Sequence, residues 1–95
     1  MRERDIEKHL VARVKALDGE VRKVQWIGRR GAPDRLVMLP APAGPGAWMA
    51  PIWVELKAPG VKPEAYQLRE HKRMRAMGQR VVVIDSLESV EELLS

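Results

Sequence analysis

The stretch Ile-Trp-Val-Glu-Leu-Lys-Ala at positions 52–58 predicts a β-strand, because apolar and β-branched residues dominate it and Pro59-Gly60 ends it. Side chains in a strand alternate between its two faces. Glu55 and Lys57 therefore share one face with Trp53, while the other face is wholly apolar. An acid and an amine two residues apart on an otherwise apolar strand need an explanation.

A second apolar run, residues 35–39, starts directly after Asp34. If this run pairs with 52–58 as a hairpin, Asp34 lies beside Glu55. Two carboxylates make an oxygen-ligand site for a hard divalent cation, and Lys57 adds a cationic group next to it. The sequence therefore predicts a cation site at this end of the strand pair.

The composition is that of a small globular protein. The 95 residues suit one domain, 1–95, with one modest core, and 45 % of them are hydrophobic and 32 % charged. The absence of cysteine excludes disulfides and thiolate zinc sites. No apolar run reaches the length of a membrane span, and residues 1–5 lack the apolar segment of a signal peptide. A reducing, cytoplasmic compartment is compatible with this composition.

The net charge of +4 is unevenly distributed along the chain. Residues 85–95 contain Asp85, Glu88, Glu91 and Glu92 but no basic residue, so all 17 lysines and arginines lie before them. A basic body suits a polyanionic partner such as nucleic acid, although a basic balance alone is a weak signal.

Residues 3–17 predict a helix with one apolar stripe at helical spacing. The stripe consists of Ile6, Leu10, Val14 and Leu17. Glu7 lies near it, which leaves two interpretations open: an acid at the edge of the stripe or paired with an arginine, or an acid aimed at the same site as Asp34 and Glu55. Asp18-Gly19 should end the helix.

Residues 20–27 predict a strand, and the glycine-bounded basic loop 28–33 leads from it into Asp34. Such a loop can bring backbone amides and the guanidinium groups of Arg29 and Arg30 to a DNA phosphate. A solvated turn is the alternative.

The uncharged, proline-rich segment 40–51 predicts a surface loop between two strands, and we expect its Trp48 to cap the core. Residues 64–77 predict a helix. One face of it carries Gln67, Leu68, His71 and Met74. Gln67 either belongs to the site near Lys57 or satisfies a buried backbone group.

Residues 80–84 predict a central strand that is buried on both faces, and Ser86 can cap a last helix, 87–94. The predicted order is α-β-β-β-α-β-α. The first three strands should form an antiparallel meander, and the strand-helix-strand step from 52 to 84 should give a parallel pair. The expected fold class is α/β, a small mixed sheet flanked by helices on both faces.

The assembled residues resemble the pattern of the PD-(D/E)XK nuclease superfamily, and more closely its VRR-NUC branch. The pattern consists of Glu7, Gly31-Ala32-Pro33-Asp34, Glu55-Leu56-Lys57 and Gln67. The resemblance covers nearly the whole chain, and its two small departures are Ala32, where the family often has valine, and the length of the turn before Gln67. It implies a restriction-endonuclease-like αβββαβ core and a Mg²⁺- or Mn²⁺-dependent endonuclease that cuts DNA.

The chemistry of phosphodiester hydrolysis fits these residues. A cation held by Asp34 and Glu55, with the Leu56 carbonyl as a third oxygen ligand, neutralises the scissile phosphate and activates water. Lys57 can hydrogen-bond the attacking water or stabilise the developing oxyanion. The resemblance implies that Glu7, through water, and Gln67 complete the site.

Two alternatives of other classes stay open: a nucleic-acid-binding module without catalysis, and a protein-interaction module with basic faces. His9 and His71 lie outside any His-Glu-x-x-His pattern, which speaks against a zinc protease, and no glycine-rich ATP loop is present. His71 is expected at the core or its edge.

The small stand-alone relatives that the chain resembles act as homodimers on four-way DNA junctions, which implies a homodimer and a branched DNA substrate here. Two apolar groups support an interface: Trp48 in the 40–51 loop, and Val90, Leu93 and Leu94 at the chain end.

Overall fold

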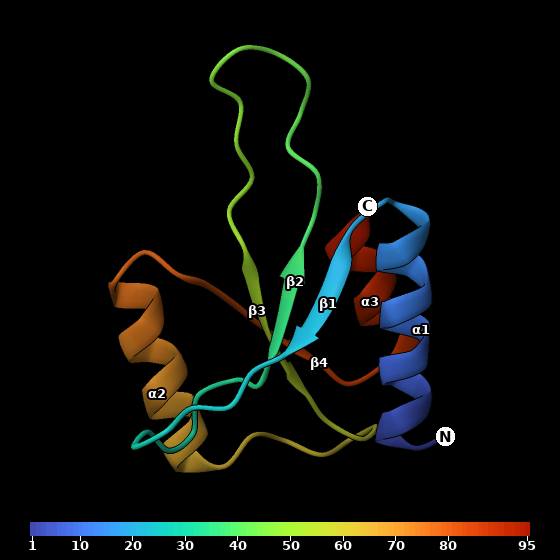
Figure 1. Ribbon diagram of the computed structural model, residues 1–95. Coiled ribbons are helices and arrows are strands. Elements are labelled where there is room, and N and C mark those ends of the chain that lie inside the picture. The colour runs from blue at the N-terminus through green and yellow to red at the C-terminus, as the bar shows by residue number, and fades with distance from the viewer.

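The computed structural model describes residues 1–95, and its seven elements follow the predicted order (Figure 1). They are α1 (Glu3–Ala16), β1 (Glu20–Lys23), β2 (Arg35–Met38), β3 (Ile52–Leu56), α2 (Ala65–Ala76), β4 (Arg80–Ile84) and α3 (Leu87–Leu94). None of the helices is both long enough and apolar enough to cross a membrane.

The four strands form one mixed sheet in the order β1-β2-β3-β4. The first three are antiparallel neighbours, and β4 runs parallel to β3, as predicted. The prediction of a central β4 is wrong, because β4 is an edge strand that pairs with β3 alone. Of its valines and isoleucine, Val81 and Ile84 are buried, while Val82 and Val83 are only partly covered. An apolar run could not distinguish this edge position from a central one.

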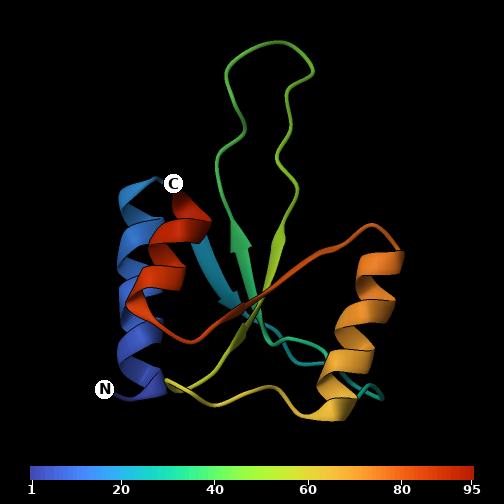
Figure 2. The ribbon, with the colours of Figure 1, turned by 180° about the vertical axis from the view of Figure 1, so that it is seen from behind.

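Helices cover both faces of the sheet. α1 and α3 lie side by side on one face, and α2 lies on the other (Figures 1 and 2). The main core lies between the sheet and the α1/α3 layer. Its buried members are Ile6, Leu10, Val14, Val37, Ile52, Val54, Leu56, Ile84 and Val90.

The stripe predicted for the first helix is confirmed for Ile6, Leu10 and Val14, but not for Leu17. Leu17 is 41 % exposed because the helix ends at Ala16 and Leu17 caps it. The next residue, Asp18, has a left-handed backbone (φ 64°) that turns the chain toward β1.

β1 is shorter than the predicted strand 20–27. The Val24 N–H still donates to the Asp34 carbonyl (2.9 Å), but Ile27 is 94 % exposed. Past that point the Trp26 Nε1–H donates to the Pro33 carbonyl (2.8 Å). A hydrogen bond from a side chain to the end of the 28–33 loop thus replaces the backbone pairing of a strand. The apolar pattern of the sequence could not reveal this.

The loop between β2 and β3 projects beyond the sheet (Figure 1). The expected capping of the core by Trp48 is wrong, because this side chain is 76 % exposed on the projecting loop. The four prolines of the loop lack a backbone N–H, which interrupts continuous strand pairing along it.

α3 begins with the predicted serine cap, in which the Ser86 Oγ accepts from the Ser89 N–H (2.9 Å). The expectation of an exposed apolar group at the chain end is wrong. Val90 is fully buried in the main core, and Leu93 and Leu94 pack against it. α1 supplies the covering surface, a tertiary contact that local sequence does not encode.

Candidate active site

Asp34 and Glu55 oppose each other across β2 and β3. Arg35 pairs with Val54 in the antiparallel register, so the next position along brings Asp34 opposite Glu55. Both side chains lie on the α2 face of the sheet, because the α1 face holds Val54 and its neighbours in the core. The Asp34 side chain is 58 % exposed, while Glu55 is buried, with 7 % of its surface exposed.

His71, a residue of α2, contacts the buried carboxylate of Glu55. Its Nε2 lies 3.2 Å from the Glu55 Oε1, and its side chain is fully buried. The predicted core position of His71 is confirmed, but its contact with Glu55 was not predicted. Helical spacing placed His71 on the covered face of α2, yet nothing in the sequence indicates which strand residue it meets.

The charge state of Glu55 is sensitive to its surroundings. Burial raises the pKa of Glu55 to about 7, an effect that Lys57 opposes and that the negative charge of Asp34 reinforces. Burial also lowers the pKa of His71, with Arg75 acting in the same direction. A neutral His71 can therefore donate its Nε2–H to Glu55, which leaves the buried Nδ1 without a partner.

Arg35 connects the exposed acid to the first helix. Its guanidinium forms an ion pair with Glu7 of α1, and its Nη1 lies 2.9 Å from the Asp34 carboxylate. Glu7 is thus paired with an arginine, and the same arginine links it to Asp34. Sequence reasoning missed Arg35, whose side chain turns to the α1 face because it alternates with Asp34.

Lys57 and Gln67 complete the predicted set. Lys57 directly follows β3, where its backbone N–H donates to the Ile84 carbonyl (2.9 Å), and its charge acts on Glu55. The Gln67 Oε1 accepts from the backbone N–H of Glu64 (2.8 Å) and so caps the start of α2. The structure brings Lys57 to the acids, while the Gln67 carbonyl oxygen is used in the cap.

The basic loop is fastened to α2. Arg29 Nε and Nη2 lie 2.8 and 2.7 Å from the carboxylate of Glu70, which also receives Arg73 Nε (3.1 Å). These arginines, Arg29 first, lower the pKa of Glu70 to about 2. The Arg30 guanidinium stacks over the Tyr66 ring at 3.9 Å.

Gly31 makes this close docking possible. Its φ is 88°, and a Cβ at this position would lie 2.9 Å from the Tyr66 carbonyl oxygen. Only glycine fits this approach between the loop and α2. The same docking fixes the backbone that leads into Asp34.

The donor set fits a hard divalent cation. No group of three or more His, Cys, Asp or Glu side chains is arranged for a metal. Magnesium, however, is usually bound by one or two carboxylates and keeps several waters, so Asp34, Glu55 and the Leu56 carbonyl suffice. The raised pKa of Glu55 also fits, because a cation beside it would offset the burial of its negative charge.

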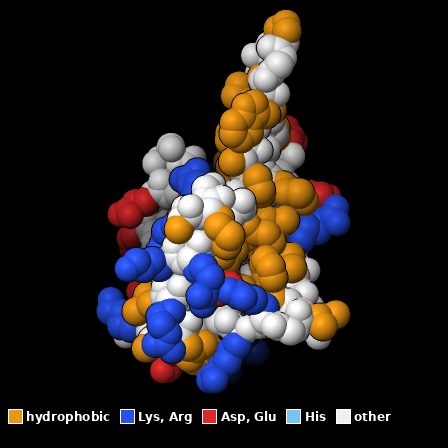
Figure 3. Space-filling model, turned by 90° about the vertical axis from the view of Figure 1, so that its left-hand side faces the viewer, with side chains coloured by type: hydrophobic (Ala, Val, Ile, Leu, Met, Phe, Trp, Pro, Cys, Tyr) orange, Lys and Arg blue, Asp and Glu red, His pale blue; other side chains and the backbone are white.

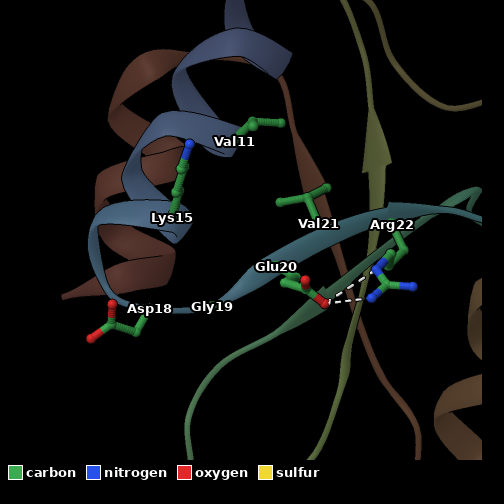
Figure 4. Close-up of a pocket in the computed structure, with 7 residues that line it drawn as sticks. All are labelled: Val11, Lys15, Asp18, Gly19, Glu20, Val21 and Arg22. Carbon is green, nitrogen blue, oxygen red and sulfur yellow. Dashed lines mark hydrogen bonds and ion pairs between the residues drawn. The ribbon is translucent and has the colours of Figure 1, made fainter.

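The largest hollow of the protein lies elsewhere, between the end of α1 and β1 (Figure 4). It measures about 480 Å³, and its Glu20 and Arg22 bind each other at 2.6 Å. None of the residues predicted for the active site lines it.

Comparison with known proteins finds relatives that match nearly the whole chain. No family model matches it. The chain is 51 % identical over 86 residues to "Putative nuclease p44" of Acyrthosiphon pisum secondary endosymbiont phage 1, covering 90 % of this chain and 85 % of the phage protein. A solved structure described as a VRR_NUC domain superposes with a TM-score of 0.79 at 41 % identity, over 97 % of this chain and 92 % of the other. The predicted α/β fold is therefore confirmed.

Proposed function

The chain belongs to the VRR-NUC family, and from this premise we propose that it is a metal-dependent endonuclease that hydrolyses phosphodiester bonds in DNA. The observation that carries the proposal is the facing of Asp34 and Glu55 across β2 and β3, with Lys57 beside them. A protein that only binds DNA gains nothing from a buried carboxylate near a phosphate, because the two repel each other.

The residues divide the chemistry among them. Asp34, Glu55 and the Leu56 carbonyl would hold Mg²⁺ or Mn²⁺, which when bound supplies positive charge at the scissile phosphate. Lys57 holds the attacking water or stabilises the oxyanion. His71 orients Glu55, and Glu7, through Arg35, orients Asp34. Glu7 reaches the cation only through water, and Gln67 keeps α2 in place beside Lys57.

Substitution of the three central residues tests the activity. Asp34→Ala, Glu55→Ala and Lys57→Ala should each abolish Mg²⁺- or Mn²⁺-dependent cleavage while binding of DNA is retained. Glu92→Gln, on the exposed side of α3, is the matched control and should cleave normally. Cleavage by Glu55→Ala at the wild-type rate would sink the nuclease proposal. A wild-type protein that binds DNA without cutting it would favour the binding module.

The finer substrate proposal is branched DNA, in particular a four-way junction cut by a homodimer. A two-fold dimer presents two active sites to two strands. A panel of single-stranded, duplex, flap and four-way DNA, digested with each metal, tests this selectivity. Equal rates on all four would contradict it.

Arg29 and Arg30 are proposed to contact phosphates beside the site. Glu70 already holds two edges of Arg29, so the freer guanidinium of Arg30 should contribute more. The Arg29→Ala/Arg30→Ala protein should lose affinity about equally for unrelated sequences, with a log-log salt slope shallower by about one to two units. A sequence-dependent loss would refute backbone contact.

A further inference from the structure

A second hollow of about 460 Å³ lies on the α2 face of the sheet. Its lining combines two tryptophans from the sheet side with two methionines and an arginine of the α2 side. The lining consists of Trp26, Trp53, Met74 and Met77 together with the polar residues Arg29, Glu70, Arg73 and Gln79. Its volume lies in the range of ordinary ligand sites. Figure 3 shows this side of the molecule, where hydrophobic side chains gather below the projecting loop and lysines and arginines border them.

The two indoles are fixed in place by their polar edges. The Trp26 Nε1–H donates to the Pro33 carbonyl, and the Trp53 Nε1–H donates to the Gln79 Oε1 (3.1 Å). Their ring centroids are 5.1 Å apart with an interplanar angle of 51°. Both indole N–H groups are thus satisfied, and what the rings offer the hollow is aromatic surface. Such surface binds flat apolar rings.

The floor and the rim differ in character. Met74 is buried and Met77 is 65 % exposed, which gives an apolar, polarisable floor and an adaptable edge. Arg29 and Arg73 stand at the rim and share one carboxylate, Glu70. Two guanidinium groups against one carboxylate leave the rim positive. A ligand with a flat ring and a negative group matches both parts.

The hollow adjoins the acid pair. Trp53 lies two residues before Glu55 on the same face of β3, and the carbonyl that holds Trp26 belongs to Pro33, directly before Asp34. A DNA strand with its phosphate at the acids therefore brings the neighbouring nucleotide to the tryptophans.

We propose that this hollow receives the unpaired base of a nucleotide next to the scissile phosphate. The inference rests on the proposed nuclease function and deepens it. Bases inside a duplex are stacked on each other and cannot enter, whereas an unpaired base exposes both faces to aromatic side chains. The protein would thus select DNA in which a nucleotide beside the cut is unpaired or can leave the stack, as at a flap or a branch point. A base without sequence preference is expected, since every base has a stacking face.

The test removes one base at a time from the DNA. A duplex with one single-stranded flap, whose branch point fixes where the protein binds, carries a single abasic site that is moved along the flap strand. It is compared with the complete strand in the same flap DNA, by cleavage with Mg²⁺ and by metal-free binding in fluorescence anisotropy. In the wild-type protein one position next to the cut should show a loss of about 5- to 100-fold. The Trp26→Leu protein should lose this position-specific penalty. Leu17→Ala, which shortens an exposed apolar side chain outside the hollow, should retain it.

The outcomes separate the two proposals. A flat abasic scan with normal cleavage of the complete strand overturns the base site alone. No cleavage, but a position-specific loss in binding, overturns the nuclease alone. The wild-type scan requires no variant, so it decides even if Trp26→Leu unfolds. Equal cleavage and binding at every abasic position, together with dissociation of a dimer in Trp26→Leu, would indicate that a second copy of the chain occupies the hollow. This result would overturn the proposal.

Discussion

Glu55 is the residue at which folding and chemistry conflict. A carboxylate on a sheet strand, buried under α2, loses hydration, and its one hydrogen-bond partner is the neutral ring of His71. The result is a pKa of about 7. A site of this kind is less stable with the charge present than without it, and a bound cation would relieve the difference.

Stability should fall as Glu55 ionises. The pKa of Glu55 in the folded protein, about 7, exceeds the ordinary glutamate pKa of about 4.5, so its contribution to stability is full below pH 4.5 and is lost as pH rises through about 7. The Glu55→Gln protein should lack this loss and be more stable above pH 7 by about 2 kcal/mol. Urea unfolding below pH 4.5 and above pH 7 measures both proteins. Equal pH dependence in the two would contradict the assignment.

Cation binding should also depend on the ionisation of Glu55, but cation affinity should rise over the pH range in which stability falls. A protonated Glu55 cannot ligate a cation, so affinity for Mn²⁺ should rise as pH increases through about 7 and should be accompanied by proton release. Calorimetric titration in buffers of different ionisation enthalpy measures this release. In Glu55→Gln, both the affinity and the proton release should disappear.

At the scale of elements, the loop 28–33 is positioned by a helix that follows it by more than thirty residues. Glu70 of α2 binds Arg29 from the loop and Arg73 from its own helix, and Gly31 allows the loop to approach the Tyr66 backbone. The docked loop then delivers Asp34 to the start of β2. α2 therefore contributes to the site both through His71 and through this docking.

Loss of the Glu70 carboxylate should loosen the loop. The pKa of Glu70 in the folded protein, about 2, is below the ordinary glutamate pKa of about 4.5, so its contribution to stability is present above pH 4.5 and is lost as pH falls toward 2. Glu70→Gln should cost about 1 kcal/mol at neutral pH, a value discounted for the exposure of both arginines, and weaken the acid dependence. Denaturant unfolding across this range tests it. If the variant lost stability between pH 4.5 and pH 2 as the wild-type protein does, Glu70 would not be the cause of that loss.

The last helix depends on its cap. The Ser86 Oγ accepts the Ser89 N–H, and α3 places Val90 in the core. Ser86→Ala should reduce the free energy of unfolding by about 1 kcal/mol. Ser95→Ala, at the chain end, is the control and should have little effect. Thermal unfolding of the two variants compares them directly.

At the scale of the whole molecule, the loop 40–51 is an apolar segment that the rest of the chain leaves uncovered. The projecting 40–51 loop is exposed over nearly its whole length, and its Trp48 side chain is 76 % exposed. The C-terminal helix no longer supports an interface, because Val90 is in the core. The proposal of a homodimer therefore rests on the loop alone.

Charge on the loop should separate a dimer. Light scattering of the wild-type protein at micromolar concentration should give about twice the 10.8 kDa chain mass, and the Trp48→Lys protein should give the mass of one chain. Leu68→Lys, at an exposed apolar position of α2, is the matched control and should leave the dimer intact. A monomeric wild-type protein that still cuts junctions would mean that one chain engages the DNA alone.

The sequence by itself determined the element order and the strand pairing that opposes Asp34 and Glu55, because periodicity and turn residues act locally. The tertiary structure alone decided which partners these residues meet. His71 on Glu55, Arg35 between Glu7 and Asp34, and Glu70 on Arg29 all join segments distant in sequence. The same holds for two further features. The edge position of β4 depends on whether another strand pairs with it, and the burial of Val90 depends on how α3 packs against the rest of the protein.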